Sequence, residues 1–204
     1  MFKKINYAFN DSLIEKVTQL TNYIDKQSCE LYGDPSSGYI AENDDQQQVI
    51  DYYKNNRFSS FVHHSFPLKS FVNELPSCFF EKETPKINWQ VISGGLSLPA
   101  HVDLQRKCAL NFYFKCDNET TYFYNRKRQG VFLKEKDNKY ISNELFIPEW
   151  LEKCDEFIAN KYDVYLLNTT VPHSVESSKE QTRISISFSY YNASFEDILK
   201  CLKN

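Results

Sequence analysis

The sequence predicts a mainly β protein with helices at its N-terminus. Apolar side chains recur at helical spacing over residues 13–26, near the start of the chain. By contrast, five segments between residues 87 and 190 are rich in β-branched and aromatic residues and are bounded by turn residues. The links between these segments are mostly too short for crossover helices, so we expect antiparallel strands that form a sandwich or a barrel.

The first 80 residues are expected to be mainly helical. The apolar face of residues 13–26 follows Ser12, which has the form of a capping box with Glu15. Three further elements are predicted in this part of the chain, namely a loop over 33–38 and helices over 45–56 and 67–75.

The remainder of the chain carries the β pattern. The predicted strands are 87–93, 108–116, 120–125, 163–170 and 183–190. Between them, the basic cluster at 126–139 is expected to form a solvated hairpin, with a lip over the active site as the alternative, and 148–158 is expected to be a short helix. The sequence therefore predicts one compact domain, in which a helical layer (1–80) packs on a β core (81–204).

Composition restricts the class of protein. The formal net charge is −3, which makes duplex nucleic acid an unlikely partner because a phosphate backbone selects basic surfaces. No stretch approaches the ~20 apolar residues that cross a bilayer, and the first residues are too polar for a signal peptide. Six cysteines without a CxxC pair are typical of a reducing compartment, so we expect a cytoplasmic protein.

His101 and Asp103, in "LPAHVD", are the first candidate site residues. In a strand, residues i and i+2 point to the same face, so this imidazole and carboxylate can lie side by side. His173, in "LLNTTVPHSV", is the third candidate, and Pro172 is expected to stiffen the loop that carries it. Two histidines and one carboxylate leave three metal positions open, the arrangement of non-haem Fe(II) oxygenases. Because no paired cysteines accompany these residues, a structural zinc site is not favoured.

The segment "TRISISFSY" alternates strictly between apolar and polar residues. Its polar face begins with Arg183 and continues with Ser185 and two further serines. A guanidinium can bond both oxygens of a buried carboxylate, and Ser185 can donate to the same group. Arg183 lies ten residues after His173, a spacing that allows this carboxylate pocket to lie close to the metal.

His101-x-Asp103, then His173, then Arg183-x-Ser185, resembles the Fe(II)/2-oxoglutarate-dependent oxygenase superfamily. The likeness covers residues 86–190 and is nearest the small aspartyl/asparaginyl-hydroxylase-like and phage-borne members. The resemblance implies a double-stranded β-helix, a cupin-like jelly roll, for the β core. It also implies a dioxygenase that hydroxylates an amino-acid or peptidyl side chain and releases succinate and CO2, so a small-molecule or peptidyl substrate is expected.

The resemblance further implies the roles of individual residues. The metal ligands that it assigns are His101, Asp103 and His173. The residues that it associates with binding of the co-substrate are Arg183, Ser185, Asn111 and Arg106, the last two as secondary candidates. By this likeness, 2-oxoglutarate chelates Fe(II) and presents its distal carboxylate to the arginine at the start of "RISISFSY", while O2 takes the remaining metal position.

Two other functions fit the same residues. A cupin-like metal protein can use the triad without 2-oxoglutarate, although it has no clear use for Arg183 and Ser185. In a non-catalytic jelly-roll binding module, the triad would be a coincidence of short patterns. The adjacent pair His63 and His64 is not expected to ligate a metal, because neighbouring residues point apart on a strand.

Overall fold

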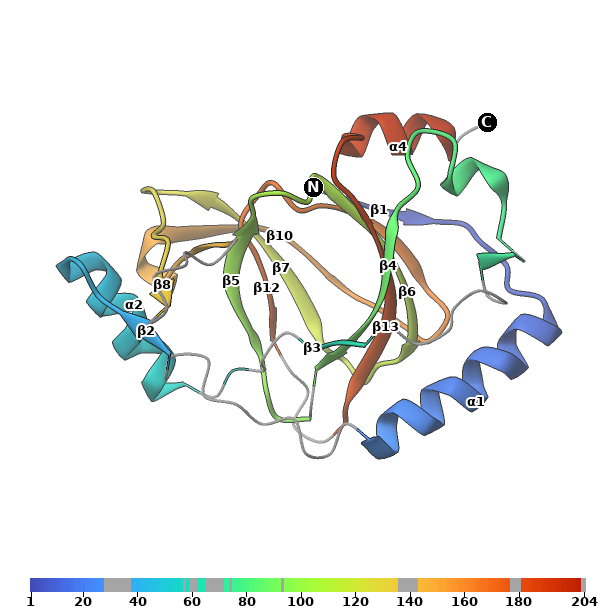
Figure 1. The fold of residues 1–204 in the computed structure, drawn as a ribbon, viewed down its shortest axis with the longest axis horizontal. Coiled ribbons are helices and arrows are strands. Elements are labelled where there is room, and N and C mark those ends of the chain that lie inside the picture. The colour runs from blue at the N-terminus through green and yellow to red at the C-terminus, as the bar shows by residue number, and fades with distance from the viewer. Residues whose placement is uncertain are drawn as a thin grey trace.

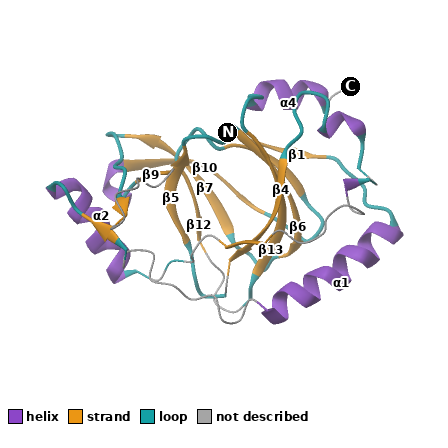
Figure 2. Ribbon diagram, viewed as in Figure 1, coloured by secondary structure: helices purple, strands orange, loops and turns teal. Residues whose placement is uncertain are grey.

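The computed structural model of the chain describes residues 1–27, 38–56, 58, 62–64, 72–73, 75–92, 94–135, 143–176 and 181–202. Two antiparallel sheets face each other, and helices lie on their outer sides (Figure 1; Figure 2). This arrangement confirms the mainly β class with helices in the N-terminal part. Two predicted elements, the loop at 33–38 and the helix at 67–75, fall mainly outside the described residues.

The described strands form two large sheets and one small one. The spatial order of the six-stranded sheet is β1 (Phe2–Ile5), β11 (Val164–Asn168), β6 (Cys108–Lys115), β13 (Arg183–Tyr190), β4 (Lys86–Ile92) and β3 (Val62–His64). The order of the five-stranded sheet is β10 (Leu151–Ile158), β7 (Thr120–Arg126), β12 (His173–Glu176), β5 (Leu98–Asp103) and β9 (Asn143–Leu145). A small pair joins β2 (Tyr39–Ile40) and β8 (Lys134–Glu135). The described helices are α1 (Asp11–Gln27), α2 (Asp44–Asn55), α4 (Phe195–Cys201) and the 3-10 turns η2 (Ser77–Phe79) and η3 (Pro148–Trp150).

Strand β13 has one apolar face and one polar face, as its sequence predicts, yet all eight of its residues are buried. Its apolar side chains pack in a large cluster with β4, β6, α1 and α4 on the outer side of the six-stranded sheet. Its polar side chains turn inward, since Arg183 reaches the hydroxyl of Thr121 on β7 in the other sheet. The space between the sheets is therefore partly polar, which is the environment that a buried site requires.

Helix α1 begins earlier than the capping box at Ser12 predicts. Its first residue is Asp11, and the side chain of Asn10 accepts a hydrogen bond from the backbone amide of Leu13 at 2.8 Å. The prediction of Ser12 as the cap was wrong because Asn10, three residues before Leu13, takes the N-cap position and leaves Ser12 inside the first turn. The predicted apolar face is confirmed at Leu13 and Val17, which are buried against the six-stranded sheet.

Helix α2 covers the five-stranded sheet and matches the predicted helix 45–56 to within one residue at each end. Its buried side chains pack with residues of β5, β9 and β10 in a second apolar cluster. Basic residues of the 126–139 segment also hold it, since Arg128 pairs with Asp45 of α2, and Lys134 pairs with Glu42 just before it. Residues 126–129 are exposed, as predicted, but the expected hairpin is not formed by the described residues of this segment, because β8 pairs with β2.

The segment 148–158 is a 3-10 turn followed by strand β10, so the prediction of a helix was wrong. Strand β10 pairs with β7 along its whole length, with a shift in register between Lys153 and Asp155. Because of this shift, Leu151 packs in the cluster beneath α2, whereas Phe157 packs among aromatic rings between the sheets. Because this edge strand buries one residue on each face, its sequence does not alternate between apolar and polar residues. The charged residues between Leu151 and Phe157 instead resemble the exposed surface of a helix.

The N-terminal part of the chain contributes strands as well as helices. Strand β1 pairs with β11 at one edge of the six-stranded sheet, and β3 pairs with β4 at the other. The ring of Phe2 lies 4.7 Å from that of Phe157, within the aromatic cluster between the sheets. The N-terminal part of the chain therefore adds edge strands to the six-stranded sheet in addition to its helices.

Two expectations from composition bear on the described residues. The five cysteines among them are free thiols, in agreement with the scattered cysteine pattern. Within the same residues, no helix combines the length and apolar character needed to cross a membrane.

Glu83 fixes the turn between β13 and α4. Its carboxylate accepts hydrogen bonds from the backbone amides of Tyr191, Asn192 and Ala193, at 2.9–3.1 Å. Partial burial would raise the pKa of Glu83, but these hydrogen bonds outweigh burial and hold its pKa below the ordinary value.

Glu83→Gln is expected to lower the free energy of unfolding at pH 7 by about 1–1.5 kcal/mol, because the backbone amides would then bond a neutral oxygen, which is a weaker acceptor than the carboxylate. The folded pKa lies below the unfolded one, so this stabilisation is present above about pH 4.3 and is lost as pH falls through the folded value. Urea unfolding of both proteins at pH 7 and at acid pH measures the difference. The control is Glu81→Gln, at an exposed position, and equal losses in both variants would contradict the anchoring role.

Candidate metal centre and carboxylate pocket

The three residues predicted as metal ligands meet on the inner face of the five-stranded sheet. Strands β5 and β12 are neighbours, and their register places His173 directly opposite His101. The two imidazole rings lie 4.4 Å apart between centroids. One ligand atom from each of His101, Asp103 and His173 lies within 4.8 Å of the other two. The pairing of adjacent strands thus brings together residues that are 70 positions apart.

His173 is the first residue of strand β12, so the prediction that a loop carries it was wrong. Strand β12 pairs on one side with β5 and on the other with β7. The carbonyl of Pro172 also accepts a hydrogen bond from the amide of Tyr124 at 2.9 Å. Since proline is tolerated just before a strand, the imidazole projects from a rigid sheet rather than from a loop.

Both imidazoles are oriented by their own backbone. The Nδ1 atom of His101 lies 2.8 Å from the carbonyl of Pro99, and that of His173 lies 3.0 Å from the carbonyl of Val171. If Nδ1 carries the proton in each ring, Nε2 presents a lone pair. Each Nε2 lies 3.9 Å from an oxygen of Asp103, so the three potential ligand atoms converge. Such backbone hydrogen bonds fix the tautomer and the orientation of metal-binding histidines.

The protonation states also suit a metal. Burial, together with the neighbouring imidazole of His101, lowers the pKa of His173 to about 3. Burial also lowers the pKa of His101. Burial would raise the pKa of Asp103, but Arg106 and the two histidines outweigh it and hold that pKa below the ordinary value. At neutral pH the site therefore offers two neutral imidazoles and one carboxylate, the protonation states that metal binding requires.

The ligand-free protein is expected to lose stability as pH falls below about 6.5. The unfolded chain then binds protons that the buried histidines do not accept, because the pKa values of His101 and His173 are lowered in the fold. Each histidine contributes a slope of about 1.4 kcal/mol per pH unit once the unfolded residue is protonated. Urea unfolding across this range should show a shallower slope in His173→Ala than in wild type, and an unchanged slope would contradict the prediction.

Arg106, a predicted cofactor-binding residue, is hydrogen-bonded to Asp103. Its Nε and Nη2 atoms both donate to the Oδ2 atom of Asp103, at 2.8 and 2.5 Å. The carbonyl of Arg106 in turn accepts a hydrogen bond from the hydroxyl of Thr169, whose own carbonyl accepts from the amide of Asp103. Arg106 thus occupies one carboxylate oxygen and leaves Oδ1 for a metal.

Arg183 lies between the sheets, only 5% exposed. It donates hydrogen bonds to the hydroxyls of Tyr113 and Thr121, at 2.8 and 3.3 Å, and its guanidinium lies 4.6 Å from the centroid of the Tyr113 ring. In the described part of the chain, no carboxylate forms an ion pair with it. A buried guanidinium without an anion carries a large desolvation cost, so this position favours an anionic ligand.

Arg183 lies between the same two sheets as the metal ligands. Thr121, which Arg183 reaches, is two residues from Phe123 on β7, and Phe123 pairs with His173 in the adjacent strand. Residues two apart on a strand share a face, so the hydroxyl of Thr121 and the imidazole of His173 face the same space. A ligand that contacts both the metal and the arginine would therefore lie between the sheets.

Ser185 and Asn111 also belong to this interior. Ser185 is 1% exposed and pairs with Tyr113, but the described residues include no hydrogen-bond partner for its side chain. The amide nitrogen of Asn111 lies 3.4 Å from the Tyr113 hydroxyl, while its buried oxygen has no partner among the described residues. The structure thus places both residues near Arg183 without direct contact between them and the guanidinium.

Tyr113 and Thr121 were not identified from the sequence. Strand parity carried part of the signal, because Tyr113 shares the face of Asn111 on β6. Thr121 could not be identified in this way, because only the tertiary structure shows that β7 of one sheet faces β13 of the other.

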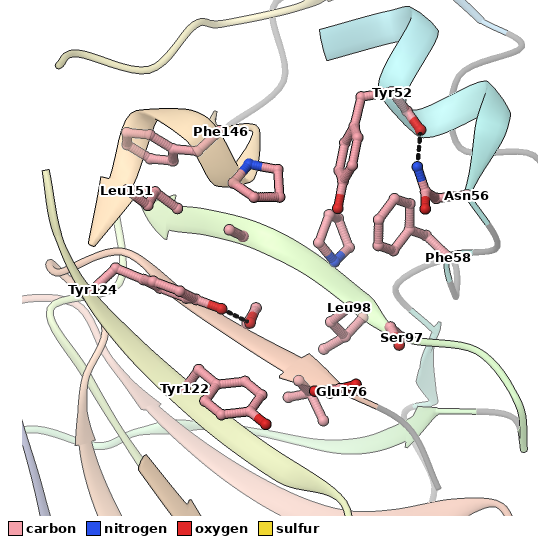
Figure 3. A pocket seen from close by; sticks show the side chains of 15 residues that line it. Tyr52, Asn56, Phe58, Ser97, Leu98, Tyr122, Tyr124, Phe146, Leu151 and Glu176 are labelled. Atoms are coloured by element: carbon pink, nitrogen blue, oxygen red, sulfur yellow. Dashed lines mark hydrogen bonds between the residues drawn. The ribbon is translucent and has the colours of Figure 1, made fainter. Parts of the chain in front are cut away.

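A separate cavity of about 310 Å³ lies on the opposite face of the five-stranded sheet, beneath α2. Figure 3 shows Tyr52 and Phe58 on one side of it and Tyr122 and Tyr124 on the other. The hydroxyl of Tyr124 lies 2.8 Å from that of Ser174, the residue next to His173. Because neighbouring residues on a strand face opposite ways, this cavity lies behind the metal ligands and does not contain them.

The donor set fits a catalytic divalent metal better than a structural one. Two imidazoles and one carboxylate satisfy half of an octahedron, and among the described residues no fourth histidine, cysteine or carboxylate joins the group. Structural zinc sites usually close with four protein ligands, often cysteines. Iron(II) with open positions for small molecules therefore fits the residues present.

No protein-family model matches the sequence, and no curated protein sequence matches it. Among solved structures, the chain is similar to AviO1 from Streptomyces viridochromogenes Tue57, with 11% identity over 94% of this chain and 89% of that one, and a TM-score of 0.52. A Pseudomonas putida prolyl-4-hydroxylase aligns at 10% identity over 94% and 93% of the two chains, with a TM-score of 0.43. The chain spans 50% of the length of Peruvianin-I, a cysteine peptidase from Thevetia peruviana latex, with 52% of this chain aligned at 14% identity and a TM-score of 0.30. At these identities the AviO1 likeness shows a shared fold alone, and the other two carry no further argument.

Proposed function

We propose that the protein is an Fe(II)- and 2-oxoglutarate-dependent dioxygenase with a double-stranded β-helix core. The observation that carries this proposal is the buried guanidinium of Arg183, which has no carboxylate partner among the described residues and lies between the same two sheets as the His-Asp-His group. A metal protein that did not bind a carboxylate would gain nothing from this costly arrangement. Hydroxylation of an amino-acid or peptidyl side chain is the reaction that we assign to it.

Two groups of residues between the sheets would have separate roles. His101, Asp103 and His173 would hold Fe(II), while Arg183, with the hydroxyls of Tyr113 and Thr121, would hold the distal carboxylate of 2-oxoglutarate. Bound iron supplies the centre at which O2 is activated as 2-oxoglutarate is converted to succinate and CO2.

Neighbouring groups set the charge and the orientation of the proposed metal ligands and exclude water from them. Arg106 keeps Asp103 ionised, and the backbone carbonyls at Pro99 and Val171 keep the two imidazoles directed at the metal position. The fully buried ring of Phe123, 6.1 Å from the ring of His173, excludes water from one side of the site.

Anaerobic titration of the metal-free protein with Fe(II) and then 2-oxoglutarate tests the proposal without knowledge of the primary substrate. We expect the weak visible charge-transfer band of a chelated 2-oxo acid, and we expect His101→Ala and Asp103→Ala to abolish it. Asn125→Ala, at an exposed position on β7, is the control and should retain the band.

The same titration separates the other two functions. Iron binding without the band would favour a cupin-like metal protein that does not use 2-oxoglutarate. If the protein binds neither iron nor 2-oxoglutarate, a non-catalytic binding module takes the place of the enzyme.

A further inference from the structure

A polar cavity of about 350 Å³ opens beside the metal-binding carboxylate. Its walls come from β4, from the end of β13 and from the end of β5 with the turn that follows it. The lining residues that matter here are Lys86, Asn88, Gln90, Asp103, Arg106 and Asn143. The volume is at the small end of the range for ligand sites, so the cavity suits a molecule of about amino-acid size.

Three amide side chains in this cavity have no hydrogen-bond partner among the described residues, namely those of Asn88, Gln90 and Asn143. Asn88 is the most informative because it is only 8% exposed. The register places Asn88 opposite Ser187 and therefore on the inner face of the six-stranded sheet, and it places Asn143 opposite Asp103. Buried amides are normally hydrogen-bonded, so these groups are available to bind a polar molecule beside the metal.

The charges in the cavity favour an anion. Arg106 uses Nε and Nη2 for Asp103, while its Nη1 atom makes only long contacts of 3.4 Å to the hydroxyls of Ser187 and Ser189. Lys86 lines the same cavity and has no ion pair in the described part of the chain. A divalent metal would share the single negative charge of Asp103, which leaves the loaded cavity positive. A carboxylate matches both the charge and the planar fork of a guanidinium.

We propose that the primary substrate is a free carboxylic acid of about amino-acid size. Its carboxylate lies at Arg106 and Lys86, and its other polar groups bond the amides of Asn88, Gln90 and Asn143. This inference rests on the proposed function and adds the substrate class, because a peptide with blocked carboxylates would leave the cations without a partner.

The test measures succinate release by the iron-loaded protein with 2-oxoglutarate and a panel of free amino acids and small carboxylic acids, each matched with its carboxamide. At least one free acid is expected to raise succinate release above background, and its carboxamide is expected to be about tenfold less effective. Asn88→Ala and Lys86→Gln should each raise the KM for that acid about tenfold and should leave the charge-transfer band unchanged. Asn125→Ala, which removes an exposed amide on β7, should leave this KM unchanged.

The outcomes distinguish the substrate class from the proposed function. If the band forms but no free acid in the panel stimulates succinate release, or if carboxamides stimulate it equally, the substrate class is wrong and the oxygenase proposal stands. Wild-type KM values in both cavity variants would also overturn the assignment. If no band forms, the oxygenase proposal fails and this inference fails with it.

Discussion

His173→Ala is expected to lower Fe(II) affinity by more than about 100-fold and to abolish turnover of 2-oxoglutarate. Changes to residues that merely orient metal ligands commonly cost 10–100-fold in affinity, so the loss of a ligand should cost more. The remaining pair, His101 and Asp103, provides two donors, too few for a tight site. Isothermal titration with Fe(II) under anaerobic conditions measures the affinity, and succinate release measures turnover.

The matched control for this variant is the next residue on the same strand. Ser174 faces the cavity beneath α2 and bonds Tyr124, so Ser174→Ala should retain both Fe(II) binding and turnover. Circular dichroism should show that both variants keep the β fold, because the outer apolar clusters do not include His173. Wild-type iron affinity in His173→Ala would remove this residue from the site.

Arg183→Met is expected to weaken 2-oxoglutarate binding by at least about 30-fold and to leave Fe(II) affinity nearly unchanged. Truncation of one partner of a buried, hydrogen-bonded charge pair costs about 2–5 kcal/mol, and 2 kcal/mol corresponds to this factor. Intensity of the charge-transfer band against 2-oxoglutarate concentration measures the first effect, and Fe(II) titration measures the second.

The same substitution should not lower the stability of the ligand-free protein. The guanidinium of Arg183 is buried without a carboxylate among the described residues, so an apolar side chain of similar length removes a desolvation cost. Urea unfolding of wild type and Arg183→Met measures this. Equal losses of iron affinity, 2-oxoglutarate affinity and stability would instead mean that Arg183 is structural.

The placement of side chains within each strand was predictable because it rests on a short-range rule. Side chains two apart on a strand share a face, which paired His101 with Asp103 and placed Arg183 with the serines of β13. The strict alternation over 183–190 also fixed the bounds of that strand correctly. Local spacing was sufficient to predict the orientation of side chains on a strand that has one apolar face and one polar face.

The errors fall where a partner far away in the sequence decides the structure. The helix predicted at 148–158 is a strand because β7 supplies its hydrogen bonds and a register shift hides its pattern. The contact of Arg106 with Asp103 was not predicted, because no local rule shows that this side chain turns back onto the carboxylate. Thr121 was missed because only the approach of the two sheets brings it to Arg183.

The inward position of the polar face of β13 has a consequence for the motions of the fold. The large apolar cluster joins the six-stranded sheet to α1 and α4, and a second one joins the five-stranded sheet to α2, so each sheet forms a stable unit with its own helices. The two units meet partly through aromatic rings, including Phe123 and Phe157, and partly through polar side chains that gain little by leaving water. The two sheets should therefore separate first where polar side chains of β13 lie between them, while the aromatic cluster stays packed. This local opening should require less free energy than global unfolding. Such local opening gives small molecules a path to the space between the sheets while each sheet stays folded with its own helices.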